Sequence, residues 1–214
     1  MAGDVKPRRP YRSERRREQA EQTRSRALEA AARLFQERGY EGTSIAAIAE
    51  EAGISPETVY AGFGTKRALL GELVERAVRG DDPKPVPEQA GPRALAAATD
   101  QREQLRLFAA DIARRLERAG PLVAVVAGAA RSEPELADLL ARLHDTRRRN
   151  LAALVDALAA NGPLALPPAE ALDTVWALTS PELHQLLVRV RGWKRGRYAE
   201  WLAETLAQLL LPHT

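Results

Sequence analysis

The sequence from Thr43 to Lys66 reads TSIAAIAEEAGISPETVYAGFGTK and contains two short helical patterns that meet at a glycine. The first pattern repeats small apolar residues at helical spacing, namely Ile45, Ile48, Ala49 and Ala52. Gly53 supplies the backbone freedom that a tight corner requires. Two helices joined by such a corner form a helix-turn-helix, so this stretch predicts that motif.

The second helical pattern carries its own start signals. Ser55 can cap the free amide groups of the first turn, and Pro56 suits the first helical position, where no backbone donor is lost. Glu57 places negative charge at the positive end of the helix, and the pattern ends near Gly62. An ordinary helical corner would show the same local signals, so the motif needs support from the rest of the chain.

The composition predicts an all-α protein with little aromatic content. Hydrophobic residues make up 45% of the 214 residues and aromatic residues 5%, and Ala, Leu, Arg and Glu dominate. Because the chain has no cysteine, disulfides, thiol nucleophiles and thiolate metal sites are excluded, and we expect a cytoplasmic protein. The longest uncharged apolar stretch, residues 119–130, is too short to span a membrane, and the charged N-terminus lacks the apolar core of a secretory signal.

Positive charge is concentrated at the N-terminus. Residues 1–26 hold nine Lys and Arg against four Asp and Glu, whereas residues 81–214 hold seventeen of each. A basic segment beside a helix-turn-helix is what attraction to DNA phosphates requires. A solvated tail is the alternative, and we expect residues 1 to about 18 to be disordered without a partner.

The positions of glycine and proline predict a domain order. We expect a basic, disordered arm over residues 1–22, a helix-turn-helix DNA-binding domain over 23–80, and a helical ligand-binding and dimerisation domain over 81–214. Further helices are predicted over 23–38, 66–79, 100 to about 118, 122–130, 132 to about 160, 167–176 with a kink or restart at 179–182, and about 196–211. Helix breaks are predicted from Gly80 to Pro92 and at Gly120-Pro121.

Residues 23–73 resemble the TetR family of bacterial transcriptional regulators. The resemblance is carried by Phe35-Gln36-Glu37-Arg38-Gly39-Tyr40, Gly42-Thr43-Ser44-Ile45, Ile48-Ala49, Ala52-Gly53-Ile54-Ser55, Thr58-Val59-Tyr60, Phe63, Lys66 and Ala68-Leu69-Leu70. The segments 176–183 and 198–202 are similar to one branch of the family. The resemblance implies a three-helix DNA-binding head, a helical ligand-binding body, a dimer formed by the last two long helices, and repression. Gly62 departs from the family, whose members often carry His or Tyr there as a phosphate contact.

The second helix of the motif supplies the candidate DNA contacts. If it enters the major groove, Ser55, Glu57, Thr58 and Ala61 lie near the bases. Phosphate contacts are expected from Thr43, Ser44, Tyr60 and Lys66. The arginines of the arm, Arg12, Arg15, Arg16 and Arg17, are candidates for an adjacent minor groove, although a disordered arm is an equal alternative.

An effector pocket in the second domain is implied by the family resemblance. Its candidate lining is Phe108, Ile112, Val126, Leu143 and Trp176, with His144 or Arg147 as polar anchors. Core packing explains the apolar members equally well, and His144 lies in a polar run typical of a solvated helix face. The three histidines lack metal-ligand spacing, and no nucleophile or phosphate-binding motif is present, so we expect no metal, no cofactor and no enzymatic activity.

An apolar stripe near the C-terminus predicts a homodimer. It comprises Leu183, Leu187, Val190, Tyr198, Trp201, Leu202, Leu206 and Leu209. Packing inside one chain is the alternative. A dimer would present two heads to a palindromic operator.

The prediction is therefore a dimeric DNA-binding repressor that a small-molecule ligand releases from a palindromic operator. A helical small-molecule-binding or enzymatic bundle without sequence-specific DNA binding is the main alternative. A peripheral membrane protein is a third, but the arm lacks the apolar face that such helices need.

Overall fold

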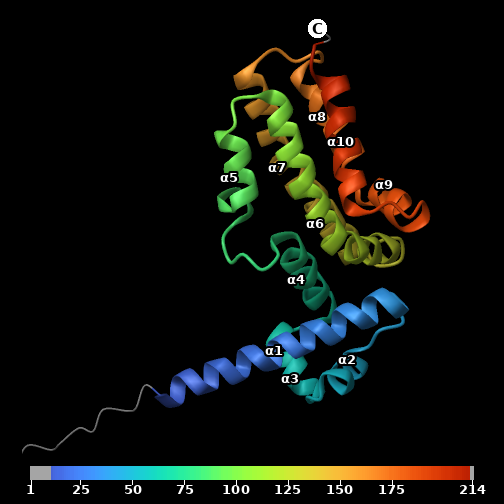
Figure 1. Cartoon of the computed structure of the whole chain (residues 1–214). Helices are drawn as coiled ribbons and strands as arrows, with labels where there is room; N and C mark the ends of the chain where they lie inside the picture. The colour runs from blue at the N-terminus through green and yellow to red at the C-terminus, as the bar shows by residue number, and fades with distance from the viewer. Residues whose placement is uncertain (1–10, 213–214) are drawn as a thin grey trace, which may run out of the picture. The chain divides into compact units, whose positions relative to one another are not determined.

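The computed structural model of the chain describes residues 11–212, with side chains from Arg15 onward, and contains no strand in that range. The predicted all-α class is confirmed. In chain order the helices are α1 (Tyr11–Arg38), α2 (Ile45–Ala52), α3 (Pro56–Phe63), α4 (Lys66–Arg79), the 3-10 turn η1 (Val86–Glu88), α5 (Ala90–Ala97), α6 (Gln101–Ala129), α7 (Pro134–Asn161), α8 (Pro168–Leu178), α9 (Pro181–Gln185), the π-helix η2 (Leu186–Val190) and α10 (Arg195–Leu210). Figure 1 traces them from blue to red.

The chain divides into two units, Met1–Leu70 and Gly71–Thr214. The division falls inside α4, whereas the domain junction expected from the sequence lies between Gly80 and Pro92. That later segment does break the helix, because Gly80 adopts a left-handed conformation at φ 75° and ends α4.

In the first unit, α1 packs across α2 and α3 (Figure 1). Its core is formed by side chains that are fully or almost fully buried, among them Leu28, Ala31, Phe35, Ile48, Val59, Leu69 and Leu70. The predicted helix-turn-helix is confirmed: α2 ends at Gly53, which is left-handed at φ 63°, and α3 begins two residues after Ile54. The four apolar residues of the first pattern are the four buried residues of α2.

The first helix begins earlier than predicted. α1 starts at Tyr11 rather than Thr23, so the part of the expected disordered arm that falls between residues 11 and 22 is helical. Arg, Glu, Gln and Ala favour helix, and extending an existing helix avoids the cost of nucleating a new one. The remainder of the predicted arm, residues 1–10, and the side chain of Arg12 lie outside the described part of the chain.

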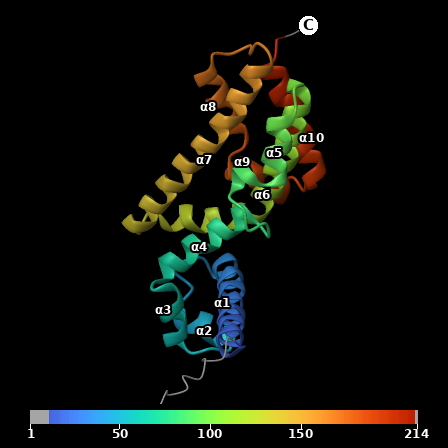
Figure 2. The same cartoon turned by 90° about the vertical axis from the view of Figure 1, so that its left-hand side faces the viewer.

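The second unit is built around α6, which contacts α5, α7, α9 and α10 (Figure 2). A core cluster joins α6 and α7 to α8 and α10, through side chains that include Leu105, Leu154, Val175, Tyr198 and Leu206. Asp100 caps α6, because its carboxylate accepts a hydrogen bond from the Glu103 amide at 2.7 Å. The long helix predicted after Ser132 is confirmed as α7.

In this unit one predicted break is wrong, and one helix was not predicted. Gly120-Pro121 does not end a helix, because α6 continues through Pro121 to Ala129. A proline inside a helix costs about 3 kcal/mol. Buried side chains on both sides of it, such as Leu116 and Val126, pack both halves of the helix into the core. The helix α5 was also missed, because Gly91 and Pro92 fall in its first turn, where proline needs no amide donor.

The chain after α8 restarts at Ser180, whose hydroxyl accepts a hydrogen bond from the Leu183 amide at 3.1 Å. This restart is one of the two outcomes predicted for the Ser180-Pro181 pair. The helix then widens into η2, where the Arg191 amide donates to the Leu186 carbonyl at 3.0 Å, and Gly192 closes it at φ 69°. α10 follows close to its predicted bounds.

Candidate nucleic-acid interface and ligand cavity

The turn between α1 and α2 fixes the start of the helix-turn-helix. Ser44 caps α2, because its hydroxyl accepts a hydrogen bond from the Ala47 amide at 3.1 Å. The Thr43 side chain is buried, and its hydroxyl donates towards the carbonyls of Leu34 at 3.1 Å and Gly39 at 2.8 Å. Of these two predicted phosphate contacts, Ser44 lies at the surface and Thr43 braces the turn from inside.

Lys66, another predicted phosphate contact, points back into the first unit. Its ammonium donates to the carbonyl of Tyr40 at 2.8 Å and to that of Thr43 at 2.9 Å. It also lies 3.9 Å from the centroid of the Tyr40 ring, which stacks on Phe35. The lysine therefore ties the start of α4 to the turn between α1 and α2.

The N-terminal end of α3 is fixed by a local hydrogen-bond network. The Ser55 hydroxyl accepts from the Thr58 amide at 3.3 Å and lies 3.1 Å from the Thr58 hydroxyl. Hydrogen bonds from its own backbone amide and from Ser55 lower the pKa of Glu57, which keeps this exposed carboxylate ionised. Buried Val59 anchors the opposite side of the helix in the core.

The outward side of α3 is open to solvent. Ser55, Glu57, Thr58, Tyr60 and Ala61 are all exposed, and Tyr60 exposes 55% of its surface. The structure thus brings the predicted base-contacting residues and Tyr60 together on one surface.

Arg24, which no sequence pattern singled out, secures the other end of α3. Its guanidinium donates to the Gly62 carbonyl at 2.7 Å and lies 4.3 Å from the centroid of the Phe63 ring. Gly62, at the position where family members often carry His or Tyr, therefore accepts a hydrogen bond at its carbonyl from Arg24 of α1. No local pattern signals this contact, because the two residues are 38 positions apart.

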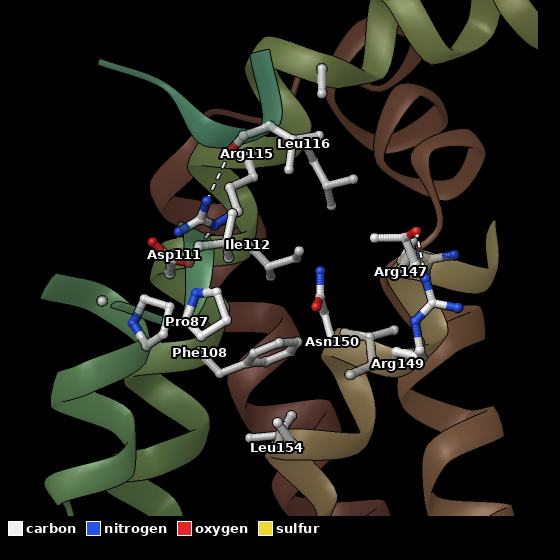
Figure 3. A pocket seen from close by; sticks show the side chains of 18 of the residues that line it. Pro87, Phe108, Asp111, Ile112, Arg115, Leu116, Arg147, Arg149, Asn150 and Leu154 are labelled. Carbon is white, nitrogen blue, oxygen red and sulfur yellow. Dashed lines mark hydrogen bonds and ion pairs between the residues drawn. The ribbon is translucent and has the colours of Figure 1, made fainter. Parts of the chain in front are cut away.

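The second unit contains a cavity of about 710 Å³, a volume in the range of small-molecule sites. It lies among the C-terminal half of α4, α5, α6 and α7, with Pro181 at its edge. Figure 3 shows Phe108, Ile112, Leu116 and Leu154 on its walls. Most of the wall is hydrocarbon, so a bound molecule would bury mainly apolar surface.

Five of the seven predicted effector contacts line this cavity, and two do not. Phe108, Ile112, Leu143, His144 and Arg147 are lining residues. Val126 is buried further along α6, outside the cavity lining. Trp176 also lies outside the lining, with its ring 5.7 Å from that of His144.

Arg147 directs its charged end towards α8. The guanidinium donates to the Trp176 carbonyl and, at 2.8 Å, to the Thr179 hydroxyl. Burial lowers the pKa of Arg147 to about 10, and its Nε and Nη1 have no hydrogen-bond partner among the described residues. In this arrangement Arg147 joins α7 to α8 rather than presenting a charge to a ligand.

A buried polar network on the opposite wall was not predicted from the sequence. Arg115 donates to Asp111 at 2.6 Å, to the carbonyl of Val78 in α4 at 2.8 Å, and to the Gln89 amide oxygen at 2.9 Å. Gln89 in turn donates to carbonyls of the segment that leaves α4, including that of Arg79 at 3.1 Å. The cavity wall is therefore bonded to the last turn of α4. The signal in the sequence was weak, since an Asp111 to Arg115 spacing is common on solvated helices.

Asn150 is a further polar lining residue that was not predicted from the sequence. Figure 3 shows its amide directed into the cavity between the walls formed by Ile112 and Leu154. An amide offers both a donor and an acceptor. The cavity thus combines an apolar lining with one central hydrogen-bonding group.

The structure separates the eight predicted dimer contacts into two groups. Tyr198, Leu202 and Leu206 are fully buried in the core of their own chain, so they do not form an outer surface. These three residues pack on α6 and α8, so for them the alternative of packing inside one chain holds. Val190 exposes 73% of its surface and Leu209 45%, while Leu183, Leu187 and Trp201 are half-buried. Leu186, 56% exposed, joins Val190 on η2.

The first unit carries an exposed helix-turn-helix, and the second is a helical bundle with a cavity. Residues 27–73 match the family described as bacterial regulatory proteins, tetR family. The match includes both helices of the motif, and over this segment the predicted resemblance to the TetR family is confirmed. Over 61 residues the chain is 39% identical to the HTH-type transcriptional regulator TtgR of Pseudomonas putida, a stretch that covers 28% of this chain and 29% of TtgR.

Solved structures share the fold along most of the chain. The TetR family transcriptional regulator PfmR from Thermus thermophilus is 26% identical with a TM-score of 0.64, over 87% of this chain and 99% of PfmR. NalD, the secondary repressor of the MexAB-OprM multidrug efflux pump in Pseudomonas aeruginosa, is 22% identical with a TM-score of 0.69, over 91% of this chain and all of NalD. Across residues 11–212, no helix is both long and apolar enough to cross a membrane.

Proposed function

We propose that this chain is a DNA-binding transcriptional repressor, and that a small molecule in the cavity of the second unit releases it from its operator. The observation that carries the proposal is the solvent-exposed outer side of α3, where Ser55, Glu57, Thr58, Tyr60 and Ala61 are open while Val59 is buried. A helix held rigidly on one side and open on the other can enter a major groove.

The roles of the exposed residues follow from their chemistry. Glu57 can accept a hydrogen bond from cytosine N4, and the Thr58 methyl group can contact thymine. Neither Arg nor Asn is present on α3 to make bidentate purine contacts, so shape and backbone contacts contribute much of the specificity. Tyr60 and the start of α2 at Ser44 are the proposed phosphate contacts.

Thr43 and Lys66 have a positioning role in this proposal. Their side chains are engaged inside the head with carbonyl groups of the α1 to α2 turn. The turn sets where Ser44 and α2 begin, so the two residues align the surface that meets the phosphates.

The ligand is proposed to be a largely apolar molecule with a hydrogen-bonding group for Asn150. Phe108, Ile112 and Leu154 supply apolar wall, and the volume of about 710 Å³ suits a small organic compound. Arg115, which is on α6 like Phe108 and Ile112, donates a hydrogen bond to the Val78 carbonyl near the end of α4. A ligand that displaces α6 would therefore pull on α4, which continues into the head, and would favour a state that no longer fits the operator.

The protein is proposed to act as a homodimer. Leu186 and Val190 on η2 and Leu209 on α10 are exposed apolar residues that a second copy would cover. Two heads related by a two-fold axis would read a palindromic operator. Catalysis has no part in this proposal.

The deciding experiment is DNA binding by the purified protein. A duplex from the region upstream of its own gene should be shifted in a gel, and the affinity should fall steeply with salt. The variant Tyr60→Ala should weaken binding on all sequences, while Tyr60→Phe, which keeps the ring, separates the hydroxyl from the aromatic contact. A protein that bound small molecules but no duplex at any salt concentration would instead be the helical bundle of the alternative.

A further inference from the structure

The first three turns of α1 extend beyond the part of the helix that packs. Its first fully buried side chain is Ala27, and every residue from Arg15 to Gln22 is exposed. In Figure 1 this blue end of α1 runs out past α2 and α3. The extension is not needed to fill the core of the head, so its sequence is free to serve another purpose.

Charge on this extension is segregated by helix face. At about 100° per residue, Arg15, Arg16, Gln19 and Arg26 lie on one half of the helix surface. Glu18 and Glu21 lie on the other half. Arg17 shares the acidic half, four residues before Glu21, which is the spacing of a helical ion pair. Over residues 15–26, α1 therefore has one basic side and one nearly neutral side.

Other arginines of α1 already hold the head together. Arg24 is bound to the Gly62 carbonyl, and Arg33 pairs with Glu51 of α2 at 2.8 Å. Both contacts serve the packing of the helix-turn-helix. Arg15, Arg16 and Arg26 lie at exposed positions, where an external phosphate can reach them.

The helical form of the extension decides which part of DNA it can meet. The minor groove of B-DNA is about 6 Å wide, whereas an α-helix with its side chains is about 10 Å or more across. The helix cannot enter the groove that a flexible arm would reach. Its arginines can still contact phosphates, which carry one charge per roughly 1.7 Å of duplex.

We infer that the extension of α1 is a second DNA-contacting element, which lies against the phosphate backbone beside the site read by α3 and binds it through Arg15 and Arg16, with Arg26 on the same face of the next turn. The inference rests on the proposed DNA-binding function. In this inference the extension increases the affinity for DNA but does not distinguish between bases, because phosphate contacts are independent of sequence.

The test compares two double variants on the same duplex, taken from the region upstream of the protein's own gene. Arg15→Ala with Arg16→Ala should weaken binding about ten-fold and should reduce the slope of log affinity against log salt by about 2 for each bound chain. Glu18→Ala with Glu21→Ala is the matched control on the same exposed turns and should leave that slope unchanged. Because all four side chains are exposed, both variants should keep the melting temperature of the wild type.

Three outcomes are distinguishable. A reduced slope for the arginine variant alone supports the inference. An unchanged slope in that variant, with normal binding by the wild type, overturns the inference and leaves the proposed function standing. A wild type that binds no duplex overturns the proposed function and the inference together.

Discussion

The ammonium group of Lys66 lies 2.8 Å from the carbonyl oxygen of Tyr40 and 3.9 Å from the centroid of its ring. One cation therefore satisfies a turn carbonyl and an aromatic face together. The Thr43 carbonyl, 2.9 Å away, completes the arrangement. The start of α4 and the entry to α2 are thereby held at a fixed distance inside the first unit.

Replacing Lys66 should destabilise the head. Lys66→Met retains most of the apolar stem but removes the donor, so the Tyr40 and Thr43 carbonyls lose their hydrogen bonds from the ammonium group. We expect a loss of about 1–3 kcal/mol in the free energy of unfolding, the range for hydrogen bonds to charged groups. Hydrogen exchange of amides in α2, such as that of Ile48, measures this loss in the first unit.

The matched control is Lys84→Met, at an exposed position in the segment after α4. It makes the same chemical change away from the head, and exchange in α2 should remain as in the wild type. Equal protection of the α2 amides from exchange in both variants would mean that Lys66 does not brace the turn. A direct contact between Lys66 and DNA phosphate would then be the better explanation of its position.

Filling the cavity should block ligand binding. Ile112→Trp places a larger ring on the α6 wall, and we expect the affinity for the fluorescent apolar probe 1-anilinonaphthalene-8-sulfonate to fall at least about ten-fold, since a site cannot hold a probe whose volume is occupied. Fluorescence titration gives the affinity. Ala141→Trp adds the same ring at an exposed position of α7 outside the lining and should bind the probe as the wild type does.

A charge on η2 should prevent dimer formation. Val190 exposes 73% of its surface in the single chain, so Val190→Asp should leave the monomer folded while placing a buried charge in the proposed dimer. Light scattering after size exclusion should report a monomer. Arg191→Asp, on the next exposed residue, controls for charge alone and should stay dimeric. A dimeric Val190→Asp protein would move the interface away from η2.

Stability should fall in mild acid because of His184. Burial lowers the pKa of this histidine, with Arg189 acting in the same direction and Glu117 opposing it. The imidazole packs edge-on against Tyr198 at 4.8 Å, and neither ring nitrogen has a hydrogen-bond partner among the described residues. The unfolded chain therefore takes up the proton more readily than the folded one as pH falls.

The stabilisation by neutral His184 is complete above its unfolded pKa of about 6.5 and is lost as pH falls below that value towards the folded pKa. His184→Phe retains a ring against Tyr198 but cannot be protonated. Urea unfolding between pH 8 and pH 5 should therefore show a smaller loss of stability in this variant. Parallel losses in the two proteins would assign the acid sensitivity to other groups.

Local chemistry made the head predictable from the sequence. The caps Ser44 and Ser55, the left-handed Gly53 and the four buried residues of α2 all depend on neighbours within a few positions, where the rules of helix ends apply. The contact between Arg24 and Gly62 is different. It joins residues 38 positions apart, and nothing in either segment indicates it.

Long-range packing explains what was missed in the second unit. Pro121 reads locally as a helix stop, yet buried residues before and after it keep α6 continuous. The Tyr198, Leu202 and Leu206 stripe identifies an apolar face, but periodicity does not say whether that face meets its own chain or a second copy. Asn150 and Arg115 are polar residues on helices, and only the folded bundle shows which of them borders a cavity.

The unbroken course of α1 from Tyr11 to Arg38 gives the head an extension of fixed length. Residues 11–22 advance about 18 Å at roughly 1.5 Å per residue, the length of about five base-pair steps at roughly 3.4 Å each. A flexible arm would protect the flanking DNA from nuclease unevenly, whereas a stiff helix would end the protected region at a fixed position. A nuclease footprint on the operator should therefore have sharp edges, and those edges should move inward by a constant number of base pairs when residues 1–22 are deleted.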